Sequence, residues 1–329
     1  MSGSPTNPLP APVPLTALRE RLALRAHVRA TLRELFDRRD FMEVDTPVLS
    51  LEVLPEAHID PIPVEVDGPG RGVHWLQASP EALMKRLLAG GSGPIYQFAP
   101  SFRAGERGAM HDIEFVLVEW YAPGATLDST APLLAAVCGS VLGSAGLERV
   151  TCRDAFREHA GIDILAATLT DWRDAGSRLG VVSPHGDDDS PDSWFELVLS
   201  DVVGPRLGRD GKPTTLELWP ANQSAFARLD SEDPRLARRF ELFVDGVELA
   251  NGWEEDIGRE LLSARIDEAN GVRAAAGRTV LPVPRRLVDA HGPSMPQGVG
   301  AALGFDRLVM LAAGATSLDA ARPFPTGGA

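Results

Sequence analysis

Apolar positions along the first fifty residues change from a helical to an extended spacing. From Leu15 to Phe36 they recur every three or four residues, with arginines between them, which predicts an amphipathic helix. Residues 41–50 then read as a strand, and Pro47 suits the edge or the end of a sheet. Residues 1–14 are rich in proline and carry no apolar period, so we expect a disordered tail there.

The densest cluster of charge falls on a predicted hairpin over residues 102–121, FRAGERGAMHDIEFVLVEWY. A strand, a polar loop and a second, half-apolar strand are typical of two antiparallel strands. The stretch carries Arg103, His111, Asp112 and Glu119 close together. Two interpretations are open at this point: a solvated surface hairpin, or a hairpin that binds a charged ligand.

A second hairpin is predicted over residues 239–256, RFELFVDGVELANGWEED. Apolar and polar residues alternate, and an Asp-Gly pair at 245–246 is typical of a tight turn. Glu241 and Glu248 lie on the strands that flank this turn. They are either solvated acids or a pair whose oxygens share a hard divalent cation.

Two further stretches pass from a strand into a helix. In residues 75–91, Ser79 is the predicted N-cap, Pro80 suits the first helical position, and Glu81 favours the positive end of the helix. Glu81 therefore either complements the helix dipole or faces a bound cation. In residues 298–314 the helix begins near Asp306.

The helix within residues 298–314 has a cation at the wrong end. Arg307 lies in its first turn, where a positive charge opposes the helix dipole. An anion would compensate this charge, and phosphate is the natural candidate. Between the charged stretches we expect a helical insertion over 125–207 that carries no chemistry, a helix over 258–276 and a proline-rich linker over 281–296.

Composition excludes several classes of protein. The net charge of −14 argues against a nucleic-acid-binding surface, which is normally basic. Cys138 and Cys152 are too few for a disulfide framework and lack metal-ligand spacing. No apolar run approaches about 20 residues, and the first residues show no basic region followed by an apolar one, so we expect a soluble, cytoplasmic protein with no membrane partner.

Three stretches, in order, resemble the signature motifs of class II aminoacyl-tRNA synthetases: FMEVDTPVLS, FRAGERGAMHDIEF and GVGAALGFDRLVML. Within that class, ASPEALMKRLL, VEWY and ELANGW look like the lysyl-tRNA synthetase catalytic domain. Motif 1 begins near residue 40, so we expect no N-terminal OB-fold domain that reads the anticodon. A free-standing core with PANQSAFARL, VELANG and Ala302 is similar to the elongation factor P–(R)-β-lysine ligases.

This resemblance implies one α+β domain over residues 15–329, with a mixed, mainly antiparallel sheet flanked by helices. It implies an enzyme that uses ATP and Mg²⁺ to activate (R)-β-lysine or lysine as an adenylate and transfers it to a lysine of elongation factor P. It also implies a homodimer through residues 18–50, although the pattern there fits an ordinary helix packed on its own sheet as well. Two alternatives remain: a free-standing lysyl-adenylate enzyme with another acceptor, and a non-catalytic synthetase-like regulator that binds lysine or nucleotide.

The resemblance also assigns site residues. Arg103 is expected on the α-phosphate and the substrate carboxylate, and Arg307 on the γ-phosphate. Further ATP contacts are expected from the motif 2 loop and the two neighbouring strands: Gly105, Glu106, His111, Asp112, Phe115, Glu248, Leu249 and Gly304. The amino-acid pocket is expected to comprise Ser79, Glu81, Glu119, Tyr121, Asn251, Trp253, Glu255 and Ala302. Glu241 and Glu248 match the magnesium-binding acids.

The motif 2 loop departs from the family pattern. Gly105 stands where an acid is usual, with Glu106 one place later, and Asp112 and Ile113 replace the usual Asn and Pro. Trp253 replaces the usual Phe. A shifted register would give Glu106 the adenine-side contact. Asp112 would repel a triphosphate unless magnesium or a neighbouring arginine compensates it.

Overall fold

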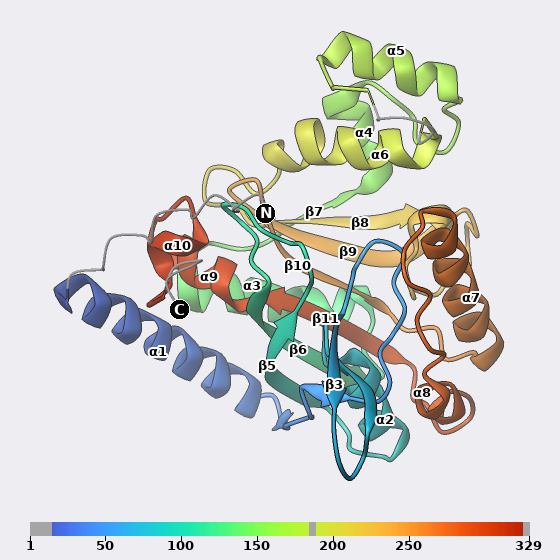
Figure 1. The fold of residues 1–329 in the computed structure, drawn as a ribbon. Helices are drawn as coiled ribbons and strands as arrows, with labels where there is room; N and C mark the ends of the chain where they lie inside the picture. Colours follow the sequence, from blue (N-terminus) through green and yellow to red (C-terminus); the bar gives the residue numbers. More distant parts are fainter. Residues whose placement is uncertain (1–14, 184–188, 325–329) are drawn as a thin grey trace, which may run out of the picture.

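The computed structural model describes residues 15–183 and 189–324 (Figure 1). The tail predicted over residues 1–14 lies outside them. The first predicted helix is confirmed as α1 (Leu15–Asp37). The single strand predicted over residues 41–50 is wrong, because two short strands replace it: β1 (Met42–Glu43) and β2 (Leu49–Ser50). Pro47 lies between them, and a residue without an N–H group interrupts a ladder of backbone hydrogen bonds.

An eight-stranded sheet forms the centre of the molecule, in the order β1-β5-β6-β11-β10-β9-β8-β7. Its other strands are β5 (Ile95–Phe102), β6 (Glu114–Pro123), β7 (Glu148–Thr151), β8 (Thr214–Pro220), β9 (Leu236–Val244), β10 (Val247–Glu254) and β11 (Gly298–Gly304). Only the outer pairs β1–β5 and β7–β8 are parallel. The second sheet has the order β2-β4-β3, with β3 (Ile62–Val66) and β4 (Gly72–Leu76). The predicted α+β fold with a mainly antiparallel sheet is confirmed.

Both predicted hairpins are present. Strands β5 and β6 pair antiparallel across the polar loop 103–113. Strands β9 and β10 are joined by Asp245 and Gly246, whose φ angles of 51° and 77° are those of a tight hairpin turn. A β-bulge follows Glu248 on β10 and changes the register there.

Helices pack on both sides of the sheet and beyond its ends. They are α2 (Glu81–Ala89), α3 (Leu127–Leu142), α4 (Cys152–Ala160), α5 (Leu169–Leu179), α6 (Pro191–Val198), α7 (Arg259–Ala275), α8 (Arg285–Ala290), α9 (Phe305–Ala312) and α10 (Leu318–Ala321). The linker predicted over 281–296 is wrong in part, because α8 lies inside it. Pro284 precedes this helix as its N-cap, where a missing N–H group costs little. None of the helices within the described ranges is long and apolar enough to span a membrane.

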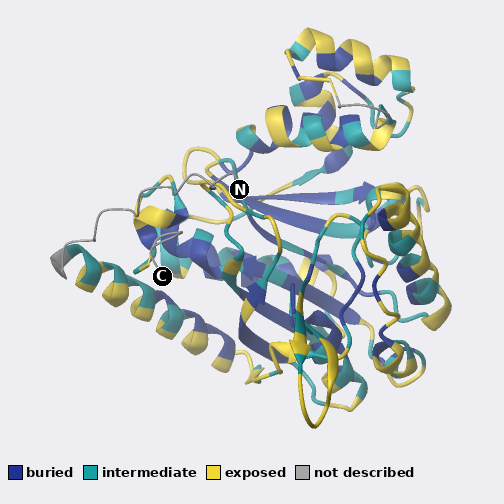
Figure 2. Ribbon diagram, in the orientation of Figure 1, coloured by how far each residue is buried: buried dark blue, intermediate teal, exposed yellow. Residues whose placement is uncertain are grey.

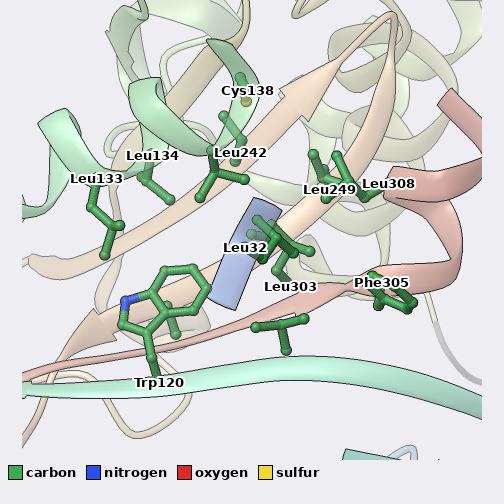
Figure 3. Close-up of a cluster of buried hydrophobic side chains, with 14 of the residues drawn as sticks. Leu32, Trp120, Leu133, Leu134, Cys138, Leu242, Leu249, Leu303, Phe305 and Leu308 are labelled. Atoms are coloured by element: carbon green, nitrogen blue, oxygen red, sulfur yellow. The ribbon is translucent and has the colours of Figure 1, made fainter. Parts of the chain in front are cut away.

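The main core lies between one face of the sheet and helices α1, α3 and α9 (Figure 3). Leu32 of α1, Trp120 of β6 and Leu303 of β11 are each 1% exposed. Figure 2 shows the result as a band of buried residues through the sheet, with exposed residues on the outer side of α1.

Residues 125–207 are divided between two cores. Helix α3 belongs to the main core, whereas α4, α5 and α6 form a lobe at the β7–β8 end of the sheet (Figure 1). In that lobe the rings of Phe156 and Phe195 stack with centroids 4.7 Å apart, and Trp219 of β8 joins them from the sheet. Cys138 and Cys152 are buried in the main core and in the lobe respectively.

Candidate active site

The register of the sheet places polar residues in one row on the face opposite the main core. Paired residues on neighbouring strands point to the same face, and adjacent residues point to opposite faces. One row across β5, β6, β11, β10 and β9 reads Gln97, Glu119, Ala302, Asn251 and Glu241. The next row, on the core face, reads Phe98, Val118, Leu303, Ala250 and Leu242. The same five strands therefore supply the hydrophobic core and a charged surface.

One end of the polar face holds a closed cluster, the acid pocket, made of Ser79, Glu81, Lys85, Glu119, Tyr121 and Glu255. Glu119 is 2% exposed and accepts hydrogen bonds from the Ser79 hydroxyl and the Tyr121 hydroxyl, both at 2.7 Å. Burial, with the Glu81 carboxylate nearby, raises the pKa of Glu119 to about 8. The pocket therefore holds an acid that an incoming cation would ionise.

Lys85, which the sequence interpretation missed, lies between two of these acids. Its ammonium is 2.6 Å from Glu81 Oε1 and 2.8 Å from Glu255 Oε2, and it is 2% exposed. Burial works against this charge, but Glu255 and Glu81 overcome it and hold the pKa of Lys85 above its ordinary value. The spacing of four residues from Glu81 on one helix was the available signal.

The N-cap of α2 lies one residue later than predicted, at Pro80 instead of Ser79. Pro80 is the N-cap of α2, and the Ser79 hydroxyl accepts a hydrogen bond from the Glu81 N–H at 3.0 Å while it donates one to Glu119. Ser79 therefore satisfies an N–H group of the helix, as a cap does, and also orients a buried acid. Glu81 lies in the first turn of α2, which agrees with the dipole interpretation, and it contacts Lys85 of the same helix. Contact with a bound cation stays a prediction.

Gly300 of β11 makes room for the pocket and was also missed. It lies opposite Tyr121 on β6 and Trp253 on β10. A Cβ atom at this position would lie 2.4 Å from Glu255 Oε1 and 2.5 Å from Tyr121 Cε1. A glycine inside a strand commonly marks such a close approach.

Glu56, in the loop that precedes β3, extends the pocket towards Arg103. It lines a small cavity together with Val53, Leu54, Gln77, Ala78, Ser79 and Glu81. Burial raises the pKa of Glu56 to about 7 against the attraction of Arg103, and Glu81 and Glu106 add to the rise. Arg273 of α7 holds this loop in place by donating to the Glu56 carbonyl at 3.0 Å. No motif in the sequence singled out this acid.

The other end of the polar face, the arginine end, comprises Arg103, Glu106, His111, Phe115, Glu248 and Arg307. The Arg103 guanidinium lies 5.0 Å from the Phe115 ring centroid and 3.7 Å from the Glu106 carboxylate. Its Nε is buried and has no hydrogen-bond partner among the described residues. A buried donor of this kind is satisfied by a bound anion or by water. Gly105 beside it has a φ of 79°.

Arg307 joins helix α9 to the loop 103–113. It donates to the Glu248 carbonyl at 2.7 Å and to the Met110 carbonyl at 3.3 Å, and its Nη2 lies 2.8 Å from His111 Nε2. Burial and the Arg307 charge lower the pKa of His111, which favours the neutral ring that can accept this hydrogen bond. Gly304, the N-cap of α9, lies beside Arg307, whose side chain passes 3.5 Å from where a Cβ would stand.

Glu241 and Glu248 form an acidic pair at the arginine end. Burial and the charge of Glu248 raise the pKa of Glu241, although Arg239 lies 2.6 Å from its carboxylate. In the part of the chain that the structure describes, no three His, Cys, Asp or Glu side chains come together as a metal site. Two carboxylates nevertheless suit Mg²⁺, which usually binds one or two protein acids and completes its shell with phosphates and water.

Three predicted residues have unexpected neighbours. Asn251 accepts a hydrogen bond from Arg239 at 3.2 Å. Leu249 is 2% exposed and its side chain lies in the main core. Any contact between Leu249 and a nucleotide would therefore come from its backbone. Asp112 lies 2.5 Å from Arg322, so an arginine does compensate its charge.

The fold and the site together define a synthetase-type catalytic domain, and comparison with known proteins agrees. Residues 15–327 match the family described as tRNA synthetases class II (D, K and N). An elongation factor P–(R)-β-lysine ligase of Enterobacter sp. (strain 638) is 36% identical over 300 residues, which cover 90% of this chain and 92% of that protein. The proteins of the same name from Salmonella dublin and Salmonella typhimurium are 37% identical with the same coverage. The chain therefore belongs to the class II tRNA synthetase family, in the branch that contains these ligases.

Proposed function

We propose that this chain activates (R)-β-lysine with ATP and transfers it to a lysine side chain of elongation factor P. One observation carries the proposal: a closed pocket of buried acids and an open pair of arginines lie on one face of one sheet, with Ala302 and Asn251 between them. The names of the relatives support the choice of substrate and acceptor. The acceptor places the reaction in the cytoplasm.

The acid pocket would receive the side-chain ammonium of the amino acid. Glu119 has both oxygens oriented by Ser79 and Tyr121, so its position is fixed before the substrate arrives. A hydrogen bond to a charged group contributes about 1.5–3 kcal/mol. Glu81 and Glu255 each contact Lys85, whereas Glu119 is bonded to two neutral hydroxyls. Glu119 and the Oε1 atom of Glu255, which is buried without a hydrogen-bond partner among the described residues, are therefore the groups left for an external cation. Trp253 and Ala302 would complete the walls of the acid pocket. Glu56 lies on the side of the pocket that faces Arg103, where the carboxylate of the amino acid would bind.

The arginine end would receive ATP. Arg103 would bridge the substrate carboxylate and the α-phosphate, since a planar fork suits both anions and its Nε has no partner among residues 15–183 and 189–324. The carboxylate oxygen forms a bond to the α-phosphorus, and the bond to the bridging oxygen of pyrophosphate breaks. Arg307 and His111 would hold the outer phosphates, and Phe115 would stack on adenine. Positioning and charge stabilisation supply the catalysis.

Glu241 and Glu248 would hold Mg²⁺ with the phosphates of ATP, and the ion would neutralise charge on the departing pyrophosphate. In the second step the acceptor lysine amine attacks the carbonyl carbon of the adenylate. An amide forms, AMP departs, and the amine loses a proton to solvent.

A homodimer through residues 18–50 is part of the proposal. Large apolar side chains are exposed on α1 and on the segment that follows it: Leu22, Met42, Val48, Leu49 and Leu51. Such a group of exposed apolar residues is typical of a protein interface. Light scattering should give the mass of two chains at micromolar concentration, and the mass of one chain would contradict the dimer.

The test of the proposed function is a transfer assay. Purified protein is incubated with ATP, Mg²⁺, (R)-β-lysine and unmodified elongation factor P, and the mass of the factor is measured. We expect a mass increase of one lysyl group that depends on ATP. If the factor keeps its mass while a known ligase modifies it in parallel, the proposed function is wrong. Pyrophosphate exchange driven better by α-lysine than by β-lysine would instead favour a lysyl-adenylate enzyme with another acceptor.

A further inference from the structure

Arg322, in the segment that follows α10, contacts two parts of the candidate active site at once. One guanidinium nitrogen lies 2.5 Å from Asp112 in the loop 103–113, and another lies 3.2 Å from Asp306 in the first turn of α9. The second nitrogen also donates to the Glu114 carbonyl at the start of β6. The three side chains are nearly enclosed, with exposures of 13% for Arg322, 12% for Asp112 and 3% for Asp306.

The same segment is tied to the loop by its backbone and to α1 by a second arginine. The Leu318 N–H donates to the Ala109 carbonyl at 2.9 Å. Arg21 of α1 donates to the carbonyls of Asp319 and Arg322 at 3.0 and 2.8 Å. The segment 318–322 is therefore fixed on one side to α1 and on the other to the loop that carries His111.

Asp306 contacts two arginines, and Asp112 contacts Arg322. Asp306 also binds Arg25 of α1 and accepts from the Val116 N–H at 2.8 Å. Asp112 accepts from the Ile113 N–H at 2.8 Å, which orients it but adds no positive charge. Arg322, at 2.5 Å, brings a positive charge that offsets its negative one.

We propose that Arg322 is a positioning residue for ATP: it neutralises Asp112 next to the triphosphate site and anchors the loop 103–113 to α9. This inference rests on the proposed binding of ATP between His111 and Arg307. Loss of Arg322 would remove this positive charge from beside Asp112, one residue from the histidine that contacts Arg307. A like charge at that position repels the phosphates and weakens their attraction to Arg307.

The proposal makes opposite predictions for the two partners of the ion pair. Arg322→Gln keeps a hydrogen-bond donor but removes the cation, so the Kd for ATP should rise about tenfold, equivalent to about 1.4 kcal/mol. Asp112→Asn removes the repelling charge and keeps an oxygen for the Ile113 N–H, so its Kd should be equal to or lower than that of the original protein. The double variant should bind ATP within about threefold of the original protein.

The experiment measures the binding of a non-hydrolysable ATP analogue with Mg²⁺ by calorimetry, without amino acid or elongation factor P. Arg285→Gln, at an exposed arginine of α8, is the matched control and should not change the Kd. Thermal unfolding of each variant establishes that it is folded. A purely structural ion pair predicts instead that both single variants weaken binding and that the double variant does not recover.

Three results would overturn the proposal: an unchanged Kd in Arg322→Gln, no recovery in the double variant, or weaker binding in Asp112→Asn alone. The last result decides the question even if Arg322→Gln does not fold. Because no amino acid is present, a protein that fails to activate β-lysine but binds ATP as described would contradict the proposed function and leave this inference intact.

Discussion

The acid pocket and the arginine end share one face of the sheet but satisfy their charges differently. In the acid pocket Glu119, Glu81, Glu255 and Lys85 are between 2% and 8% exposed and are bonded to one another or to neighbouring hydroxyls. At the arginine end the side chains of Arg103, Arg307 and Glu248 are 26%, 20% and 41% exposed. Under the proposed function the first region would receive one small cation, and the second would receive a larger anion that supplies the missing partners.

This difference predicts where substitutions act. Changes in the acid pocket should affect folding and amino-acid binding, because its charges are buried and mutually dependent. Changes at the arginine end should affect ATP binding and the rate of activation and leave stability nearly unchanged, because its charges are partly solvated.

The largest effect is expected from Lys85→Met. Removal of the ammonium leaves Glu81 and Glu255 buried together without a cation, and breaking a buried ion pair in this way costs about 3–5 kcal/mol of unfolding free energy. Urea unfolding at pH 8 measures it. Lys212→Met, at an exposed lysine before β8, is the matched control. A Lys85→Met protein as stable as the control would show that the acids of the pocket do not depend on Lys85.

Arg103→Ala should lower the rate of amino-acid-dependent ATP–pyrophosphate exchange about 10²–10³-fold, the scale for loss of one donor to a developing charge. The unfolding free energy should stay within about 0.5 kcal/mol of the original. Arg107→Ala, at an exposed arginine of the same loop, serves as the control. If both variants exchange equally well, Arg103 has no special part in activation.

Glu119→Gln should raise the KM for the amino acid by about 10- to 150-fold, which corresponds to the loss of a charge-assisted hydrogen bond of about 1.5–3 kcal/mol. The KM for ATP should be unchanged, because Glu119 lies at the other end of the polar row. Glu114→Gln on the same strand is the control, since Glu114 is exposed. An equal rise in the two KM values would contradict the division of the face into two regions.

The pH dependence of amino-acid binding is the smallest expected effect. Glu119, with a pKa of about 8 in the empty site, must ionise to bind an ammonium, so affinity should rise about tenfold between pH 7 and pH 9. The linked effect on stability has the opposite sign: a raised carboxyl pKa favours the folded state below about pH 4.5, and this contribution is lost as the pH rises through 8. Glu119→Gln should abolish both dependences, and their persistence in that variant would assign them to another group.

Much of this site could be predicted from the sequence, because the three motifs fall on local elements. The hairpin over 102–121, the Asp-Gly turn of the second hairpin and the helix that carries Arg307 depend on neighbours in the chain, so spacing and turn residues predict them. The strand over 41–50 failed because tertiary pairing assigns its two halves to different sheets.

What could not be predicted depends on register and on long-range contacts. The row from Gln97 to Glu241 exists only once five strands are aligned. Lys85 reads as an ordinary basic residue on a helix until Glu255, far along the chain, is placed beside it. Arg322 lies outside every motif, yet it compensates the most unusual residue of the motif 2 loop.

The most direct test of the account is ATP–pyrophosphate exchange with (R)-β-lysine and α-lysine measured side by side in the original protein, Arg103→Ala and Glu119→Gln. We predict exchange that is fastest with (R)-β-lysine, loss of rate at saturating amino acid in Arg103→Ala, and recovery of rate at high amino-acid concentration in Glu119→Gln. Absence of exchange with both amino acids in the original protein, under conditions in which ATP binds, would contradict the claim that this face of the sheet activates a lysine-type substrate.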